Sequence, residues 1–151
     1  MKYKTPFLLL FFTPFGALAE HHCPAISAIK QAAQIYTATG NGDDEWIGVL
    51  QESIPENKAA IKDFSEALLI IDNESDKDKN AMQGIFQKCT YNLHDAGRQV
   101  DMYYGNKTWP VSINGKPHWA YQKTAFLEIY QCSGVAAEEC QFDIVESGTT
   151  P

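Results

Sequence analysis

The chain's most specific set of possible metal ligands is Glu20, His21 and His22, which directly follow a signal-peptide cleavage site. The free α-amine, the amides of both histidines and the imidazole of His22 supply four nitrogens that can lie in one plane. Cu(II) and Ni(II) prefer this geometry. The spacing therefore predicts a copper or nickel site at the processed N-terminus. The alternative is that both rings lie on a terminus without function.

A second group of candidate residues lies between positions 103 and 121, where aromatic and amide side chains are interleaved. Flat rings beside amides suit the faces of sugars and the hot spots of protein interfaces. The alternative is that most of these rings fill the core. We predict a protein or glycan ligand for this region, and the candidate ligand-binding residues are Tyr103, Tyr104, Trp109, Trp119 and Tyr121.

No sequence motif for catalysis is present. The chain lacks a G-x-S-x-G elbow, an H-E-x-x-H metal motif and a glycine-rich phosphate loop. His94, Asp95 and Asp101 are possible parts of a hydrolase, but a turn favours Asp for its own side-chain hydrogen bond. We therefore expect a protein that is not an enzyme.

Other metals fit the sequence poorly. Zinc sites often contain a C-x-x-C pair, which this chain lacks. A calcium-binding EF-hand loop that starts at Asp72 needs Gly at position 77 and Glu at position 83, where Lys77 and Gln83 stand. We expect no cofactor apart from the possible N-terminal copper or nickel.

The N-terminus has the features of a signal peptide. Lys2 and Lys4 precede an apolar block at residues 6–18, which ends in the small-x-small site Ala17-Leu18-Ala19. The block is shorter than the roughly 20 residues that span a bilayer. We predict cleavage of residues 1–19, a single β-rich domain at residues 20–151 and a secreted or periplasmic protein without membrane insertion.

The charge balance argues against polyanionic partners. The chain has 12 basic and 19 acidic residues, a net charge of −7. Loss of Lys2 and Lys4 with the signal peptide makes it more negative. Nucleic acids are bound by clustered Lys and Arg, so we expect no nucleic acid partner.

All four cysteines follow the predicted cleavage site, so an oxidising compartment favours two disulfides. Three pairings are possible. We favour Cys132–Cys140, because residues 126–132 and 140–145 resemble strands joined by a turn. This leaves Cys23–Cys89, which would tie the mature N-terminus to the strand at residues 84–93.

Strand-like alternation dominates the rest of the chain. In residues 84–93 the side chains of Ile85, Cys89, Tyr91 and Leu93 share one parity, and Phe86 is the exception. We predict hairpins from residues 32–39 with 45–51 and from residues 84–93 with 98–104. The other predicted strands span residues 64–71, 119–132 and 140–145.

The predicted connections complete an all-β fold. We expect a loop or short helical turn at residues 55–62, a solvated connection at 72–80 and a turn-rich segment at 105–117. Seven or eight short strands at hairpin spacing predict an antiparallel sandwich or a partly open barrel.

Several short motifs resemble those of a known protein family. They are Cys23-Pro24, Tyr36-Thr37, Trp46-x-Gly48, Phe64-x-x-Ala67 and Cys89-x-Tyr91-x-Leu93. Their order over residues 23–104 resembles an uncharacterised family of small exported β-rich proteins of Gram-negative bacteria, a domain of unknown function. The resemblance implies a bacterial, secreted or periplasmic domain and supplies no catalytic residue.

These observations lead to three hypotheses. The first is an exported, non-catalytic binding protein that uses a protein- or glycan-binding surface near residues 103–121. The second is a secreted inhibitor or effector directed at a host or competitor enzyme, since a disulfide-linked acidic scaffold suits that role. The third is copper or nickel binding at the processed N-terminus.

Overall fold

Antiparallel strands make up most of the computed structural model, which describes residues 21–40, 44–71 and 82–145. The three helical elements are short: α1 (Glu56–Ala59) and the 3-10 turns η1 (Ile26–Ala28) and η2 (Ala137–Glu139). The described strands are β1 (His21–His22), β2 (Lys30–Ala32), β3 (Ile35–Thr39), β4 (Glu45–Val49), β5 (Ile61–Ile70), β6 (Gln83–Leu93), β7 (Gln99–Tyr104), β8 (Trp109–Ser112), β9 (Trp119–Lys123), β10 (Glu128–Ser133) and β11 (Gln141–Ile144).

Strand β6 lies at the centre of the sheet. One of its edges pairs with β5 along most of its length. Its other edge is shared, because residues 83–86 pair with β8 and residues 89–92 pair with β7. Two branches of the sheet therefore start from β6.

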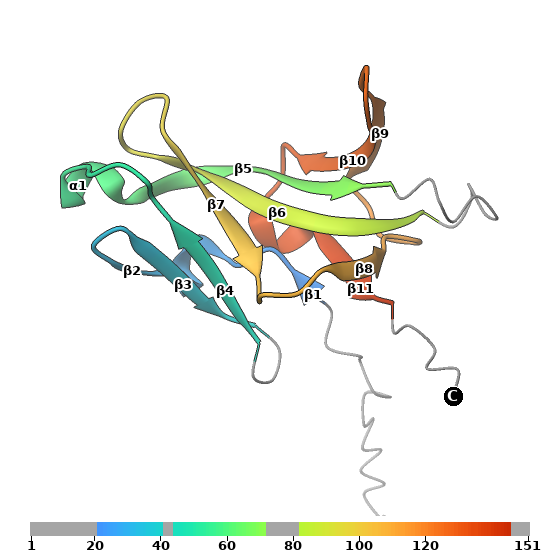
Figure 1. Cartoon of the computed structure of the whole chain (residues 1–151), viewed down its shortest axis with the longest axis horizontal. Helices are drawn as coiled ribbons and strands as arrows, with labels where there is room; N and C mark the ends of the chain where they lie inside the picture. The colour runs from blue at the N-terminus through green and yellow to red at the C-terminus, as the bar shows by residue number, and fades with distance from the viewer. Residues whose placement is uncertain (1–20, 41–43, 72–81, 146–151) are drawn as a thin grey trace, which may run out of the picture.

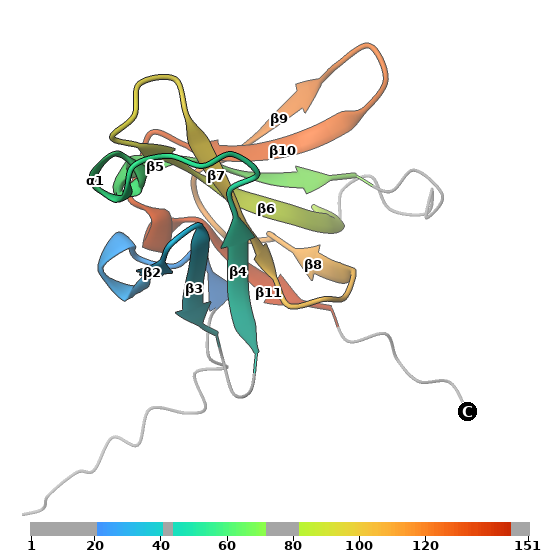
Figure 2. The same cartoon turned by 60° about the vertical axis from the view of Figure 1, so that its left-hand side comes forward.

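The two branches give the sheet a curled shape. Eight strands follow the order β1-β11-β8-β6-β7-β4-β3-β2, while β5, β10 and β9 extend the sheet from the opposite edge of β6. The sheet curls into an antiparallel half-barrel, so that β11 faces β4 across the core (Figures 1 and 2). The prediction of an all-β, partly open barrel is confirmed.

An aromatic cluster fills the space between the branches. Trp46 of β4 contacts Phe86, Tyr104 and Phe142 with ring centroids 4.8–6.4 Å apart. Phe86 and Phe142 stack at 4.5 Å. Because these rings come from β4, β6, β7 and β11, their burial joins the two branches of the sheet.

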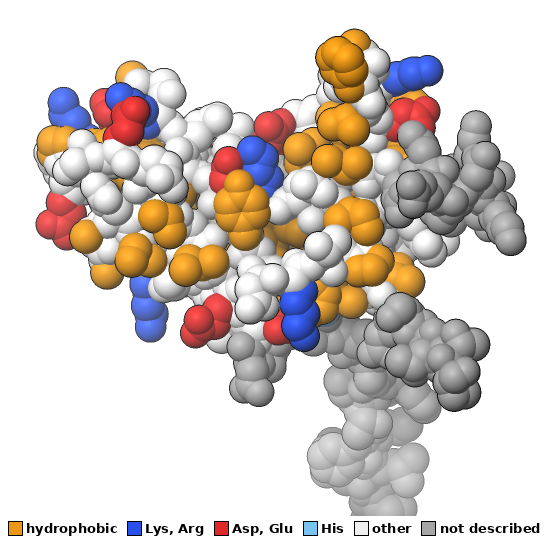
Figure 3. Space-filling view, viewed as in Figure 1, with side chains coloured by type: hydrophobic (Ala, Val, Ile, Leu, Met, Phe, Trp, Pro, Cys, Tyr) orange, Lys and Arg blue, Asp and Glu red, His pale blue; other side chains and the backbone are white. Residues whose placement is uncertain are grey.

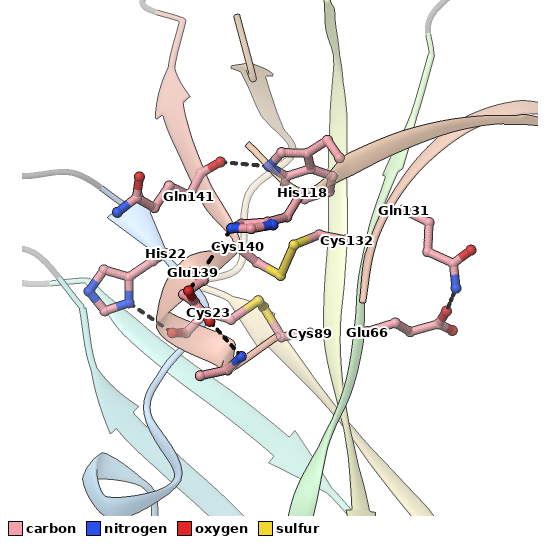
Figure 4. The surroundings of a disulfide bond; sticks show 12 residues. His22, Cys23, Glu66, Cys89, His118, Gln131, Cys132, Glu139, Cys140 and Gln141 are labelled. Carbon is pink, nitrogen blue, oxygen red and sulfur yellow. Dashed lines mark hydrogen bonds and ion pairs between the residues drawn. A yellow bond between two sulfur atoms is a disulfide. The ribbon is translucent and has the colours of Figure 1, made fainter. Parts of the chain in front are cut away.

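Both predicted disulfides are confirmed, and they lie on one row of the sheet. Cys23 bonds Cys89, and Cys132 bonds Cys140. The register places Ala67 of β5 between Cys89 of β6 and Cys132 of β10. Figure 4 shows the two disulfides close together. Ala67 is fully buried, so a small side chain at this position leaves room for both bonds.

Both predicted hairpins are also confirmed. β3 pairs with β4, and β6 pairs with β7. The predicted strand at residues 32–39 is divided, since Ala33 has a φ of 53° and the chain turns there from β2 into β3. The predicted helical turn at residues 55–62 contains α1, and the strand that follows begins earlier than predicted, at Ile61.

The predicted face of β6 is wrong at one end. Leu68 pairs with Lys88 and Leu69 pairs with Phe86, so a bulge at Gln87 shifts the register by one residue. A bulge reverses which side chains face the core. Phe86 is therefore buried with Cys89, whereas Ile85 is only half-buried.

The predicted strand pairing near the C-terminus is also wrong. Residues 119–132 form the two-stranded hairpin of β9 and β10 instead of one strand. β11 pairs with β1 and β8 and not with β10. The segment predicted to be turn-rich contains β8, and the predicted connection at residues 72–80 lies outside the described residues.

The two disulfides should contribute unequally to stability, because they close loops of different length. The paired residues are 66 positions apart in Cys23–Cys89 and 8 apart in Cys132–Cys140. Chain entropy predicts a loss of about 4 kcal/mol for Cys23→Ala/Cys89→Ala and about 2.5 kcal/mol for Cys132→Ala/Cys140→Ala. Urea unfolding of the two double variants measures this difference, and an equal loss in both would contradict it.

Substitution of Ala67 should destabilise the domain through overpacking. Ala67→Leu adds bulk between two disulfides and should lower the free energy of unfolding by about 1–3 kcal/mol. Ala32→Leu on the exposed part of β2 is the matched control and should change stability by less than about 0.5 kcal/mol. If both variants lowered the free energy of unfolding equally, a larger side chain would fit between the two disulfides, and the overpacking argument would be wrong.

Candidate functional site

The five candidate aromatic residues do not form one platform. Tyr104 is buried, and Trp109 and Trp119 are half-buried. Both indole N–H groups donate to main-chain oxygens, that of Trp109 to Tyr104 at 2.7 Å and that of Trp119 to Gln141 at 2.8 Å. Tyr103 is 48% exposed on β7 and Tyr121 is 52% exposed on β9. These two rings are the members of the set that present most surface to a ligand.

One predicted metal ligand meets one predicted aromatic residue. The Tyr104 hydroxyl donates to Asp44 Oδ2 at 2.8 Å and lies 3.4 Å from His21 Nδ1. His21 also stacks on Phe142, with ring centroids 5.8 Å apart. The adjoining cavity is about 120 Å³, well below the roughly 300 Å³ of small ligand pockets. The cavity is therefore smaller than an ordinary ligand pocket.

The N-terminal copper or nickel site remains a prediction. Glu20 lies outside the described residues. His21 and His22 form β1, which pairs with Phe142 and Gln141 of β11, and His22 Nδ1 lies 2.8 Å from the carbonyl oxygen of Cys23. Because the predicted chelate uses the amides of both histidines, metal binding competes with this strand pairing. The described residues contain no group of three His, Cys, Asp or Glu side chains that could hold a metal ion.

Two of the three possible hydrolase residues, Asp95 and Asp101, have structural partners. Asp95 lies in the turn after β6, where its main-chain oxygen accepts from the N–H of Arg98 at 3.0 Å. Asp101 lies on β7, where it accepts from Thr90 at 2.6 Å and from Lys88 at 2.9 Å. The hydrogen bond to Asp101 raises the pKa of Lys88, so the ammonium is held in its charged form.

Four exposed apolar side chains adjoin on the outside of the sheet. Register places Ile35 of β3 opposite Val49 of β4, and Ile47 of β4 opposite Tyr103 of β7. These four side chains are 43–50% exposed, and we call them the outer face. Figure 3 shows hydrophobic side chains gathered over these strands.

Two depressions border the outer face. Their volumes are about 490 Å³ and about 580 Å³, and they share Val49 and Ile54. Ion pairs between Arg98 and Glu52 and between Lys88 and Asp101 lie at the margin. A polar margin around an apolar centre is typical of protein interfaces.

Sequence reasoning missed three residues of the outer face: Ile35, Ile47 and Val49. A signal for them was present. In residues 35–38 and 46–49 apolar side chains stand at odd and at even positions, although only one face of each strand packs against the core. Large aliphatic residues of the second parity therefore remain at the surface.

The β9–β10 hairpin carries a second exposed apolar group. Phe126 at its tip is 93% exposed, and Leu127 is 46% exposed. Thr124 orders the turn, since its hydroxyl accepts from the N–H of Leu127 at 2.9 Å and donates to the Leu127 oxygen at 3.0 Å. Tyr121 supports the hairpin through a 2.7 Å hydrogen bond to Glu128. These hydrogen bonds stabilise the turn that presents Phe126 and Leu127 to solvent.

The stability of the domain should fall when the pH drops below about 6.5. Burial lowers the pKa of His21, although Asp44 and Asp143 partly oppose the shift. Neutral His21 therefore favours the folded state fully above the pKa of unfolded histidine. As the pH falls, the unfolded chain binds a proton at this residue before the folded chain does, so the free energy of unfolding decreases. Urea unfolding across this range should show less dependence on pH in His21→Gln than in His22→Gln. An unchanged profile in His21→Gln would contradict this.

Comparison with known proteins identifies a family but no activity. The sequence profile of the family "Protein of unknown function (DUF3757)" matches residues 18–143, which include both disulfides and all described strands except the last residue of β11. No curated protein and no solved structure matches the chain. Among the described residues, no helix is both long and apolar enough to cross a membrane. The chain belongs to the DUF3757 family of proteins of unknown function.

Proposed function

We propose that this chain is an exported, non-catalytic protein that binds another protein through the outer face. The observation that carries the proposal is the exposure of four large apolar side chains that adjoin across three strands. Burial of such side chains in an interface stabilises a complex by roughly 25 cal/mol per Å² of apolar surface, before the costs of association.

The composition of the outer face favours a protein over a glycan. Sugar faces stack on aromatic rings, and Tyr103 is the single ring among the four residues. Ile35, Ile47 and Val49 are aliphatic and suit the apolar side chains of a protein partner. The two adjoining depressions can receive side chains that project from that partner.

The ion pairs at the margin support a selective contact. Lys88 and Asp101 lie beside Tyr103, and Arg98 and Glu52 lie beside Val49. Exposed pairs of this kind add little affinity, but they disfavour partners that bring a like charge. The expected partner therefore has an apolar centre and few charges at its contact surface.

Two observations support export. The signal-peptide pattern at residues 1–19 directs a chain out of the cytoplasm. The described domain contains two disulfides and no free cysteine, which suits an oxidising compartment. We assign the protein to the periplasm or the exterior of a bacterial cell.

Photo-cross-linking tests the proposal directly. A photoreactive phenylalanine at position 103 should cross-link one predominant protein in the exporting cell, and the same group at exposed position 138 should not. Ile47→Lys in the same chain should weaken binding about 5- to 30-fold and reduce that product accordingly, because a buried charge in the interface costs about 1–2 kcal/mol.

The control for folding is the pair of disulfides, which Ile47→Lys should retain. Equal cross-linking from positions 103 and 138, or a product that Ile47→Lys leaves unchanged, would overturn the outer face as the binding surface. If the cross-linked protein is an enzyme that loses activity in the complex, the second hypothesis, an inhibitor, is correct.

A further inference from the structure

Strand β9 is an edge strand that the rest of the described domain leaves bare. It pairs only with β10, and Ala120, Tyr121, Gln122 and Lys123 are all exposed. Figure 2 shows the β9–β10 hairpin extending away from the other strands. A bare edge of this kind is a template for another strand.

The register shows which main-chain groups face outward. Thr124 N–H donates to the Leu127 oxygen, so these two residues form a hydrogen-bonded pair at the turn. Hydrogen-bonded pairs alternate along an antiparallel ladder, which directs Gln122 and Ala120 toward β10. The N–H and C=O groups of Trp119, Tyr121 and Lys123 therefore face the bare edge.

Apart from the single charge of Lys123, the edge has none of the devices that usually prevent pairing. Natural edge strands are protected by charges, proline or bulges. The pairing of β9 with β10 has no register shift, and residues 119–123 include one charge and no proline. The run from Asn114 to Leu127 contains no acidic residue, although the whole chain has 19. Residues 114–127 therefore bring no carboxylate to this edge, and the nearby Glu128 of β10 is held by the Tyr121 hydroxyl at 2.7 Å.

We infer that two copies of this chain pair antiparallel through β9, about a two-fold axis at Tyr121. In this register Tyr121 lies opposite Tyr121 of the second copy, and Lys123 lies opposite Trp119. The main-chain groups of Trp119, Tyr121 and Lys123 face outward, and each hydrogen-bonded pair exchanges two hydrogen bonds. The three pairs therefore form about six hydrogen bonds. Each Lys123 ammonium also meets an indole ring, which attracts a cation.

The two-fold arrangement also gives the exposed residues at the tip of the β9–β10 hairpin a contact. Phe126 and Leu127 extend beyond β9 toward the 114–118 turn of the second copy, which contains Lys116 and Pro117. Contact there covers part of the exposed ring of Phe126. Because the pairing is self-complementary, it closes at two copies and does not form a filament.

Sedimentation velocity over a concentration series tests the inference. The wild-type protein should form a dimer. Tyr121→Lys should weaken dimerisation by at least about tenfold, because two ammonium groups face each other in place of two rings. Ser133→Lys is the matched control, since Ser133 is exposed on β10 but lies opposite Glu66 of β5 in the same copy. This control should dimerise as the wild type does.

Cysteine cross-linking tests the register independently. Two residues at position 121 should lie about 5.5 Å apart between Cα atoms, within the range of a disulfide. Tyr121→Cys should therefore give a covalent dimer on oxidation, while Ala120→Cys should not, because position 120 lies opposite position 122. A monomeric wild type at all concentrations, unchanged dimerisation of Tyr121→Lys, or preferential cross-linking through position 120 would overturn the inference.

Discussion

The row Cys89–Ala67–Cys132 on the core side of the sheet is the constraint on which the rest of the domain depends. Cys89 fixes the N-terminal segment through Cys23, and Cys132 fixes the segment before β11 through Cys140. The buried Tyr91 hydroxyl reinforces the first attachment by donating to the Pro24 oxygen at 2.5 Å, and burial raises the pKa of this phenol. The segment that follows β1 and the segment that precedes β11 are therefore attached to β6 and β10.

This constraint also explains where the exposed apolar residues lie. The aromatic cluster and the disulfides fill the concave side of the half-barrel, and successive side chains of a strand point to opposite faces of the sheet. The aliphatic residues of the opposite parity on β3 and β4 remain outside. The outer face and the bare edge of β9 lie on different strands, so binding of a partner and pairing of two copies can occur together.

Much of the fold follows from local sequence patterns. Alternation and turn residues predicted the hairpins β3–β4 and β6–β7, because both patterns act over a few residues. The bulge at Gln87 and the pairing of β11 with β8 depend on contacts distant in sequence. The Cys132–Cys140 bond was predicted from a hairpin of β10 with β11 that the structure does not contain. The prediction is still correct, because the loop between these strands brings the two sulfurs together. Of the predicted site residues, Tyr103 and Tyr121 are exposed, but which parity faces outward is set by the curl of the whole sheet.

Peptide mapping of the native protein without reduction tests the central claim most directly. The protein would be recovered from the cells that export it, alkylated while unfolded and digested. Our account predicts a new N-terminus at Glu20, no alkylated cysteine, and two linked peptide pairs that contain Cys23 with Cys89 and Cys132 with Cys140. A bond from Cys89 to Cys132 or Cys140 would contradict the arrangement of the two disulfides. Free thiols would contradict both that arrangement and the proposed compartment.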